Sequence, residues 1–194
     1  MQAIQQYSDA ELINAFRNGN QSALEILINR YKDKIYTAIF MLVKDEFTAD
    51  DIFQDAFLKM IKTIRKGKYA EQGKFLPWAM RVAHNLCMDH FRKVKHNVSV
   101  VLPDGTDITD ILPASTYGAS DAMERREAHS SVRKLVESLP EEQREVVVLR
   151  IYADLSFKDI SELTGVSINT ALGRMRYGLI NLRKMIEEKN LVLR

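Results

Sequence analysis

The sequence predicts an all-α protein: two small helical domains joined by a flexible acidic linker, the second domain a helix-turn-helix. Three observations support this fold class. Apolar residues recur at helical spacing over residues 8–96. The composition then changes over Val98–Met123, and helical signals resume at Asp121. The only β-branched run, Val98–Leu102, leads into the linker, so no strand is predicted.

The first two helices belong to an N-terminal domain that we place at residues 8–97. Ser8 and Glu11 have the spacing of a capping box, and Gly19 is expected to end the short helix that follows. Asn20 is a candidate N-cap for a second, long helix. One apolar stripe runs along that helix: Leu24, Leu27, Ile28, Tyr31, Ile35, Ile39 and Leu42.

Two more helices complete the domain. We expect Thr48 to cap the third, with Asp50 and Asp51 in its first turn. Its predicted inner face is Ile52, Ala56, Phe57, Met60, Ile61 and Ile64. A loop over Arg65–Lys74 carries two glycines and four basic residues, and Pro77 suits the first turn of the fourth helix. That helix turns Ala79, Val82, Ala83 and Leu86 inward.

The second half begins after the linker. Residues 98–123 contain four aspartates, two prolines, two glycines and no Lys or Arg, which is typical of a linker without its own core. The C-terminal domain is placed at residues 124–190. There, Leu139-Pro140 marks a helix break, Ser156 and Asp159 form a second capping box, and Ser167 caps a last long helix.

Length and composition narrow the class of protein. The chain has 194 residues and a net charge of +2, so nucleic-acid binding must come from local basic patches. Its single cysteine excludes an intramolecular disulfide and suits a reducing compartment. The N-terminal residues do not resemble a signal peptide, and the apolar run Ile35–Val43 is too short to span a membrane. We therefore expect a cytoplasmic protein that does not insert into membranes.

The turn at Gly165 joins two helices in the pattern of a helix-turn-helix, whose second helix places its first residues in the DNA major groove. Between Ser167 and Lys184 there are four basic residues and no acidic ones. A plain helical hairpin with a solvated basic face is the alternative, but the turn and the charge asymmetry coincide. The predicted DNA-binding residues are Lys158, Ser167, Asn169, Thr170, Leu172, Gly173, Arg174, Arg176 and Tyr177.

The third helix has an acidic outer face, with Asp50, Asp51 and Asp55 on it and the apolar residues Phe53 and Leu58 off the inward stripe. Acidic residues with exposed apolar neighbours indicate docking to a basic partner. An ordinary solvated face is the alternative, and this helix alone does not decide between the two.

The fourth helix and its preceding loop combine basic and aromatic residues. Between Glu71 and Asn97 there are five Lys or Arg and two acidic residues. This combination suits single-stranded DNA, whose bases stack while its phosphates are neutralised. Trp78 has a second interpretation, as an anchor in the core. The predicted single-strand contacts are Lys66, Lys68, Lys74, Trp78, Arg81, Asn85, Asp89, Arg92 and Lys93.

No catalytic or metal site is predicted. His84, Cys87 and His90 are metal-ligand types, but steps of three drift around a helix and no fourth ligand is evident. We expect Cys87 to be a packing residue and the histidines to be partly exposed. The sequence also lacks a paired-carboxylate metal motif, a phosphate-binding glycine loop and a nucleophile elbow, so we predict neither an enzyme nor a cofactor.

Four segments in this order resemble the sigma factors of bacterial RNA polymerase, specifically the extracytoplasmic-function group: Glu46–Ile64, Phe75–Arg92, Ser138–Leu163 and the helix beginning at Ser167. The resemblance implies that the first segment binds the polymerase clamp helices, the second recognises and melts the minus-ten element, and the last reads the minus-thirty-five element. The implied polymerase-binding residues are Asp50, Asp51, Phe53, Gln54, Asp55, Phe57 and Leu58.

The resemblance also implies partners: the polymerase core through its clamp helices and flap, promoter DNA as duplex and melted strand, and an anti-sigma factor. Leu172 stands where the family usually has a basic residue, so the last helix is less basic than in many relatives. Two other classes of protein fit the sequence less well. A conventional helix-turn-helix regulator explains only the C-terminal half, and a helical adaptor ignores the DNA-facing residues.

Overall fold

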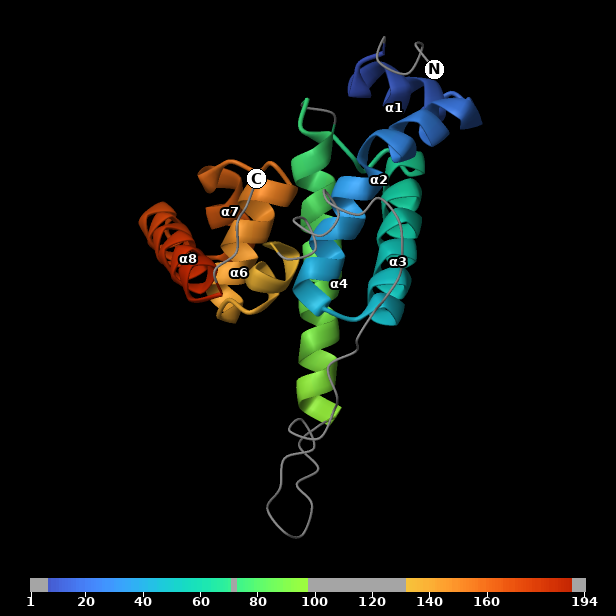
Figure 1. Cartoon of the computed structure of the whole chain (residues 1–194). Coiled ribbons are helices and arrows are strands. Elements are labelled where there is room, and N and C mark those ends of the chain that lie inside the picture. Colours follow the sequence, from blue (N-terminus) through green and yellow to red (C-terminus); the bar gives the residue numbers. More distant parts are fainter. Residues whose placement is uncertain (1–6, 71–72, 98–131, 190–194) are drawn as a thin grey trace.

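The computed structural model describes residues 7–70, 73–97 and 132–189, which form helices and no strand (Figure 1). The all-α prediction is confirmed. The helices are α1 (Asp9–Arg17), α2 (Gln21–Val43), α3 (Glu46–Arg65), α4 (Phe75–Asn97), α6 (Glu141–Val147), the π-helix η3 (Val148–Tyr152), α7 (Phe157–Thr164) and α8 (Ile168–Glu188). Residues 132–137 are also helical. The predicted linker, residues 98–123, lies outside the described residues.

Local hydrogen bonds set the helix starts of the N-terminal half. Ser8 and Glu11 form the predicted capping box at α1. Asn20 caps α2 by accepting from the backbone N–H groups of Ser22 and Ala23. Between the two helices, Gly19 has φ +98°, a conformation that glycine adopts at little cost. The chain therefore turns sharply enough for α1 to pack on α2.

The predicted start of the third helix was wrong. α3 begins at Glu46, and its cap is Asp45, whose carboxylate accepts a hydrogen bond of 2.8 Å from the Thr48 N–H. Thr48 is therefore a residue of the first turn and not the cap. The hydrogen bonds to Thr48 lower the pKa of Asp45, because they favour its charged form.

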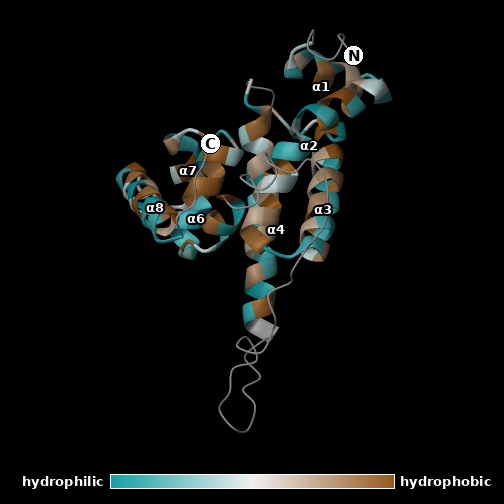
Figure 2. Cartoon of the chain, in the orientation of Figure 1, coloured by the Kyte–Doolittle hydropathy of each residue, from teal (hydrophilic) through white to brown (hydrophobic). Residues whose placement is uncertain are grey.

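The core of the N-terminal half lies between α1, α2, α3 and α4. Each helix carries hydrophobic and hydrophilic residues, the amphipathic pattern that buries one face (Figure 2). Ile35 and Ile39 of α2 are fully buried, as are Met60 and Ile64 of α3. Burying a side chain of this kind contributes roughly 1.5–3 kcal/mol. The predicted inward stripes of α2 and α3 therefore point to the core.

The C-terminal half contains the predicted helix-turn-helix. Pro140 precedes α6, which continues into the π-helix η3. Ser156 and Asp159 form the second predicted capping box, at α7. Gly165 has φ +70° at the turn, and Ser167 caps α8 by accepting from the Thr170 N–H. The turn brings α8 back against α7 and α6.

The two halves pack against each other. One hydrophobic cluster contains buried residues of both, including Ile35 and Ala83 from the first half and Val148 and Leu149 from the second. η3 packs on α2, and α7 contacts α4, whereas α8 lies on the far side of α6 and α7 from α4 (Figure 1). The relative placement of the halves could not be deduced from the sequence.

Removing the α7 cap should destabilise the C-terminal half. Ser156→Ala loses the capping hydroxyl, which is expected to lower the free energy of unfolding by about 1 kcal/mol. Ser22→Ala is the matched control, since Asn20 supplies the cap of α2. Chemical denaturation followed by circular dichroism would measure both. Equal stability of the Ser156 variant and the control would contradict this role for Ser156.

Candidate nucleic-acid and protein interfaces

The outer face of α3 is acidic and open. Asp50, Asp51, Gln54 and Asp55 are exposed, and the side chain of Leu58 is 52% exposed. Phe47, at the start of the helix, is 76% exposed, and the sequence interpretation did not single it out. A large apolar side chain beside carboxylates is suited to a protein partner that offers both apolar and basic groups.

One of the two aromatic residues predicted for this surface has a different position. Phe53 was expected to be exposed but is half-buried, whereas Phe57 was already predicted on the inner face and is half-buried. Phe53 packs edge-on against Tyr36 of α2 at 5.5 Å between ring centroids, and against Phe57 at 4.7 Å. The pKa of Tyr36 is raised to about 12, mainly because the side chain is buried and secondly because it forms a hydrogen bond with Asp50. These aromatic rings attach α3 to α2, and the exposed part of the surface combines carboxylates with the apolar side chains of Phe47 and Leu58.

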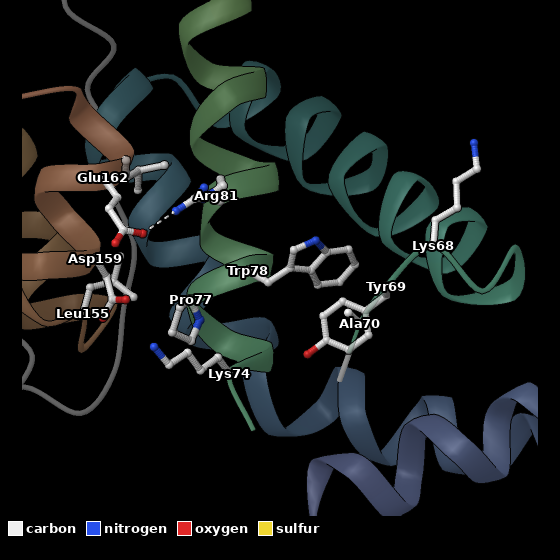
Figure 3. Close-up of a pocket in the computed structure, with 11 residues that line it drawn as sticks. Lys68, Tyr69, Ala70, Lys74, Pro77, Trp78, Arg81, Leu155, Asp159 and Glu162 are labelled. Atoms are coloured by element: carbon white, nitrogen blue, oxygen red, sulfur yellow. Dashed lines mark hydrogen bonds and ion pairs between the residues drawn. The ribbon is translucent and has the colours of Figure 1, made fainter. Parts of the chain in front are cut away.

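A cleft of about 350 Å³ lies at the N-terminal end of α4, between this helix, the loop before it and α7 (Figure 3). Trp78 is half-buried on the wall of this cleft. The centroid of its ring lies 4.4 Å from the ring centroid of Tyr69 and 5.7 Å from that of Phe75. The two interpretations of Trp78 are therefore compatible: its ring packs on neighbouring aromatic rings, and it also faces an open cavity. An aromatic wall of this kind can stack with a nucleic-acid base.

Of the predicted polar contacts on α4, Arg81 lines this cleft, whereas Asp89, Arg92 and Lys93 line another pocket, together with Asp51 and Asp55 of α3. Arg81, Asn85, Arg92 and Lys93 are exposed. Asp89 pairs with Arg92, so one predicted acidic contact residue orients a basic one. Arg81 Nη2 lies 3.2 Å from Glu162 Oε2 of α7, which places a predicted DNA-binding guanidinium against the other half of the chain.

A groove with a volume of about 430 Å³ lies beside this cleft, and Lys68 lines both. Its lining contains the predicted contacts Lys66 and Lys68, and also Lys59 and Lys62, which the sequence interpretation missed. Lys59, Lys62 and Lys66 recur at steps of three and four, so helical periodicity could have found them. Four lysines in one groove favour a phosphate backbone.

One histidine of α4 required a correction. His84 was expected to be partly exposed, yet its side chain is only 5% exposed, and its Nε2 lies 2.7 Å from Glu145 Oε1 of α6. His90 is half-buried. Cys87 is fully buried, as predicted for a packing residue, and burial raises the pKa of its thiol to about 12. Within the described residues, no group of three metal-ligating side chains is present.

The first turns of α8 present the predicted reading surface. Ser167, Asn169, Thr170, Leu172 and Arg176 are exposed. Lys158 of α7 is also exposed, and Tyr177 is 62% exposed. Gly173 and Arg174 are half-buried. The exposed apolar side chains among polar ones suit a base edge such as the thymine methyl group.

Two residues of α8 instead fix the helix in place. Arg174 Nη2 lies 3.0 Å from Glu142 Oε2 of α6, so this guanidinium is already paired within the C-terminal half. Gly178 is buried, and a Cβ at this position would come within 3.1 Å of Val147. Its lack of a side chain permits the close approach of α8 to α6. Of these two neighbouring residues, Tyr177 is exposed and Gly178 packs against α6.

Together, these surfaces define a helical DNA-binding protein that carries a helix-turn-helix and a separate acidic docking face. Residues 27–97 match the family model for sigma-70 region 2, and residues 129–172 match the model for sigma-70, region 4. No helix among the described residues is long and apolar enough to cross a membrane.

Full-length relatives agree with these matches. The chain is 30% identical to the RNA polymerase sigma factor CarQ of Myxococcus xanthus, covering 91% of this chain and 96% of that one. It is 28% identical to the ECF RNA polymerase sigma factor SigW of Bacillus subtilis, covering 91% and 95%. The chain belongs to the sigma-70 family, in its extracytoplasmic-function group, and it directs RNA polymerase to promoters.

Solved structures share the fold. The structure of CnrH in complex with the cytosolic domain of CnrY has a TM-score of 0.62 at 19% identity, covering 94% of this chain and 99% of that chain. The sigma factor RpoE of Bartonella quintana, in complex with the anti-sigma factor NepR, has a TM-score of 0.63 at 19% identity, covering 84% and 96%.

Proposed function

We propose that the two halves, residues 8–97 and 124–190 joined by residues 98–123, divide the work of promoter selection. The acidic face of α3 binds the clamp helices of the polymerase core. α4 and the loop before it bind the minus-ten element, and α8 reads the minus-thirty-five element. The observation that supports this most is the presence of an exposed acidic face, a cleft lined by aromatic and charged residues and a helix-turn-helix in one chain.

Strand opening is proposed to be driven by binding energy. Unstacking a base from the duplex costs a few kcal/mol. Stacking on an aromatic wall such as that of Trp78 returns roughly 1–3 kcal/mol per base, and the lysines of the adjoining groove neutralise phosphates. The protein therefore shifts the duplex toward its open form without a chemical step. This is the activity of a regulator and not of an enzyme.

The two DNA-binding surfaces act on one promoter. When the linker lets both engage, the second contact forms at an effective concentration set by the tether, which raises the apparent affinity. Further partners in this proposal are the polymerase flap and an anti-sigma factor, a class of partner present in the solved complex of Bartonella quintana RpoE. A bacterial protein with these partners works in the cytoplasm.

A conventional helix-turn-helix regulator is the competing function, and dependence on polymerase separates the two. Under the proposal, specific promoter binding and transcription in vitro both require the purified core. A regulator binds its operator alone. Sequence-specific promoter binding that is equally tight with and without core would refute the proposal.

We predict a selective loss when Arg176 is truncated. Arg176→Ala in the holoenzyme should weaken promoter binding about tenfold and reduce the log–log salt slope by about 1 if the guanidinium contacts a phosphate. Arg183→Ala is the matched control: it removes the same charge two turns later on α8. Binding titrations at several salt concentrations measure both. Equal losses for the two variants would argue against a specific contact by Arg176.

A further inference from the structure

One side of α8 carries an apolar stripe that the packing of the C-terminal half covers only in part. We call it the α8 seam, and its members follow one another in alternating steps of four and three residues: Ile168, Leu172, Met175, Leu179, Leu182 and Ile186. Ile168, Leu172 and Leu179 are between 42% and 45% exposed, and the other three are half-buried. Apolar residues with these steps form the seam along which helices pair in a coiled coil.

DNA reading accounts for only the first part of the α8 seam. A recognition helix contacts bases with its N-terminal residues, and Ile168 and Leu172 lie there. Leu179 follows Leu172 by seven residues, which places it about 10 Å further along the helix. α8 packs on α6 and α7, on their far side from α4 (Figure 1). The exposure of Leu179 is therefore explained neither by the core nor by base contacts.

The two flanks of the α8 seam differ in burial and charge. On one flank, Ala171 and Gly178 are buried, because this side of α8 packs against the rest of the C-terminal half. On the other flank, Arg176 and Arg183 are exposed and stand seven residues apart, so they occupy equivalent positions of successive heptads. α8 carries no acidic residue before Glu187. The open flank is therefore basic.

We propose that the α8 seam, with Arg176 and Arg183 beside it, is a docking site for one amphipathic α-helix of a partner protein. That helix carries an apolar heptad seam of its own and Asp or Glu at the flanking positions that face the two arginines. Charges at these positions of a coiled coil select the partner. A guanidinium can hold a carboxylate with two parallel hydrogen bonds, and burial of the exposed seam residues supplies the apolar part of the binding free energy.

A second copy of this chain fits the α8 seam less well than an acidic helix. In an antiparallel pair of α8 helices, Arg176 and Arg183 would face the same two arginines, and like charges across an interface are unfavourable. In a parallel pair they would face the flank of Ala171 and Gly178, which is already buried. The charge pattern therefore favours a different protein over self-association.

The test uses the full chain and a labelled peptide of about four heptads, with leucine along its seam and glutamate at the flanking positions. Fluorescence anisotropy measures its binding. A peptide of the same composition whose leucines do not form a seam is the control for charge, because any basic groove attracts both peptides. We expect the seam peptide to bind at least about tenfold more tightly than the control peptide, since only the seam peptide buries an apolar stripe.

Leu179→Asn is the first test variant, and Ile180→Asn is its matched control. The two side chains are 42% and 46% exposed, but Ile180 lies off the α8 seam, about 100° further around the helix. We expect Leu179→Asn to weaken binding of the seam peptide at least about fivefold, and Ile180→Asn less than about twofold. Circular dichroism verifies that both variants are folded.

A second pair of variants tests the charge of the open flank. Arg183→Glu should weaken binding of the seam peptide about tenfold, because a carboxylate then faces the glutamates of the peptide. Lys184→Glu changes the net charge equally at an exposed position further from the α8 seam, so a smaller loss is expected. Arg183 is used and not Arg176, because Arg176 is also assigned to promoter DNA.

Equal binding of the two peptides would overturn the proposal, and so would equal losses for Leu179→Asn and Ile180→Asn. Self-association in sedimentation velocity that Leu179→Asn abolishes would assign the α8 seam to a second copy instead. Core-dependent transcription without peptide should be the same for these two variants, and a loss confined to Leu179→Asn would assign the α8 seam to the polymerase. The peptide measurements involve neither core nor DNA, so this proposal and the proposed promoter contacts can fail separately.

Discussion

Reversing two charges on α3, with Asp51→Lys and Asp55→Lys, is expected to weaken binding to the polymerase core about 100-fold, or roughly 3 kcal/mol. Both carboxylates are exposed, so the folded chain should tolerate the change. At the proposed interface with a basic partner, each new lysine replaces an attraction by a repulsion, and like charges across an interface cost several kcal/mol. Binding of labelled protein to purified core measures the effect.

The matched control is Glu25→Lys with Asp33→Lys, which reverses two exposed charges on α2. It changes the net charge by the same amount, so it separates a local contact from long-range attraction. We expect less than a threefold change for the control at physiological salt, where exposed charges are screened over about 8 Å. Similar losses for both variants would show that α3 is not the specific docking face.

Truncating the buried centre of α7, with Ile160→Ala, is expected to lower the free energy of unfolding by about 2–5 kcal/mol. Ile160 is fully buried, so its removal leaves a cavity beside the turn that positions α8. The C-terminal half should then unfold first, with loss of binding to the minus-thirty-five element. Differential scanning calorimetry combined with promoter binding would show both effects.

Ile180→Ala on α8 is the control, because its side chain is 46% exposed and its truncation opens no cavity. A change within about 0.5 kcal/mol is expected there. Because both variants replace isoleucine by alanine within a helix, the difference between them reports burial and not helix propensity. Equal destabilisation at positions 160 and 180 would contradict the packing described for α7.

Helix starts were largely predictable because they depend on short-range hydrogen bonds. Ser8, Asn20, Ser156 and Ser167 each satisfy backbone N–H groups within three residues, and all four predicted caps are present. The exception is α3, where two capping residues stand three positions apart. Asp45 occupies the cap and its carboxylate binds the N–H of Thr48, so the periodicity alone could not choose between them.

The sequence predicted which residue types form the candidate surfaces. It was less successful in predicting which of these residues are exposed. The carboxylates of α3 are exposed as expected, whereas Phe53 is half-buried because Tyr36 of α2 packs against it. The partial exposure expected for His84 was wrong for a similar reason. Its partner Glu145 is 61 residues away, and no local pattern indicates which element will cover a given turn of α4.

The helices, their inward faces, the helix-turn-helix and the family resemblance were all predictable from the sequence, because each depends on residues that are neighbours along the chain or on a helix. The packing of the two halves, with Arg81 against Glu162 and His84 against Glu145, is seen only in the folded chain. Contacts between distant segments depend on shape and charge complementarity across a whole interface, which no local spacing encodes. The cleft beside Trp78 also depends on that packing, because residues of α7 form part of its wall.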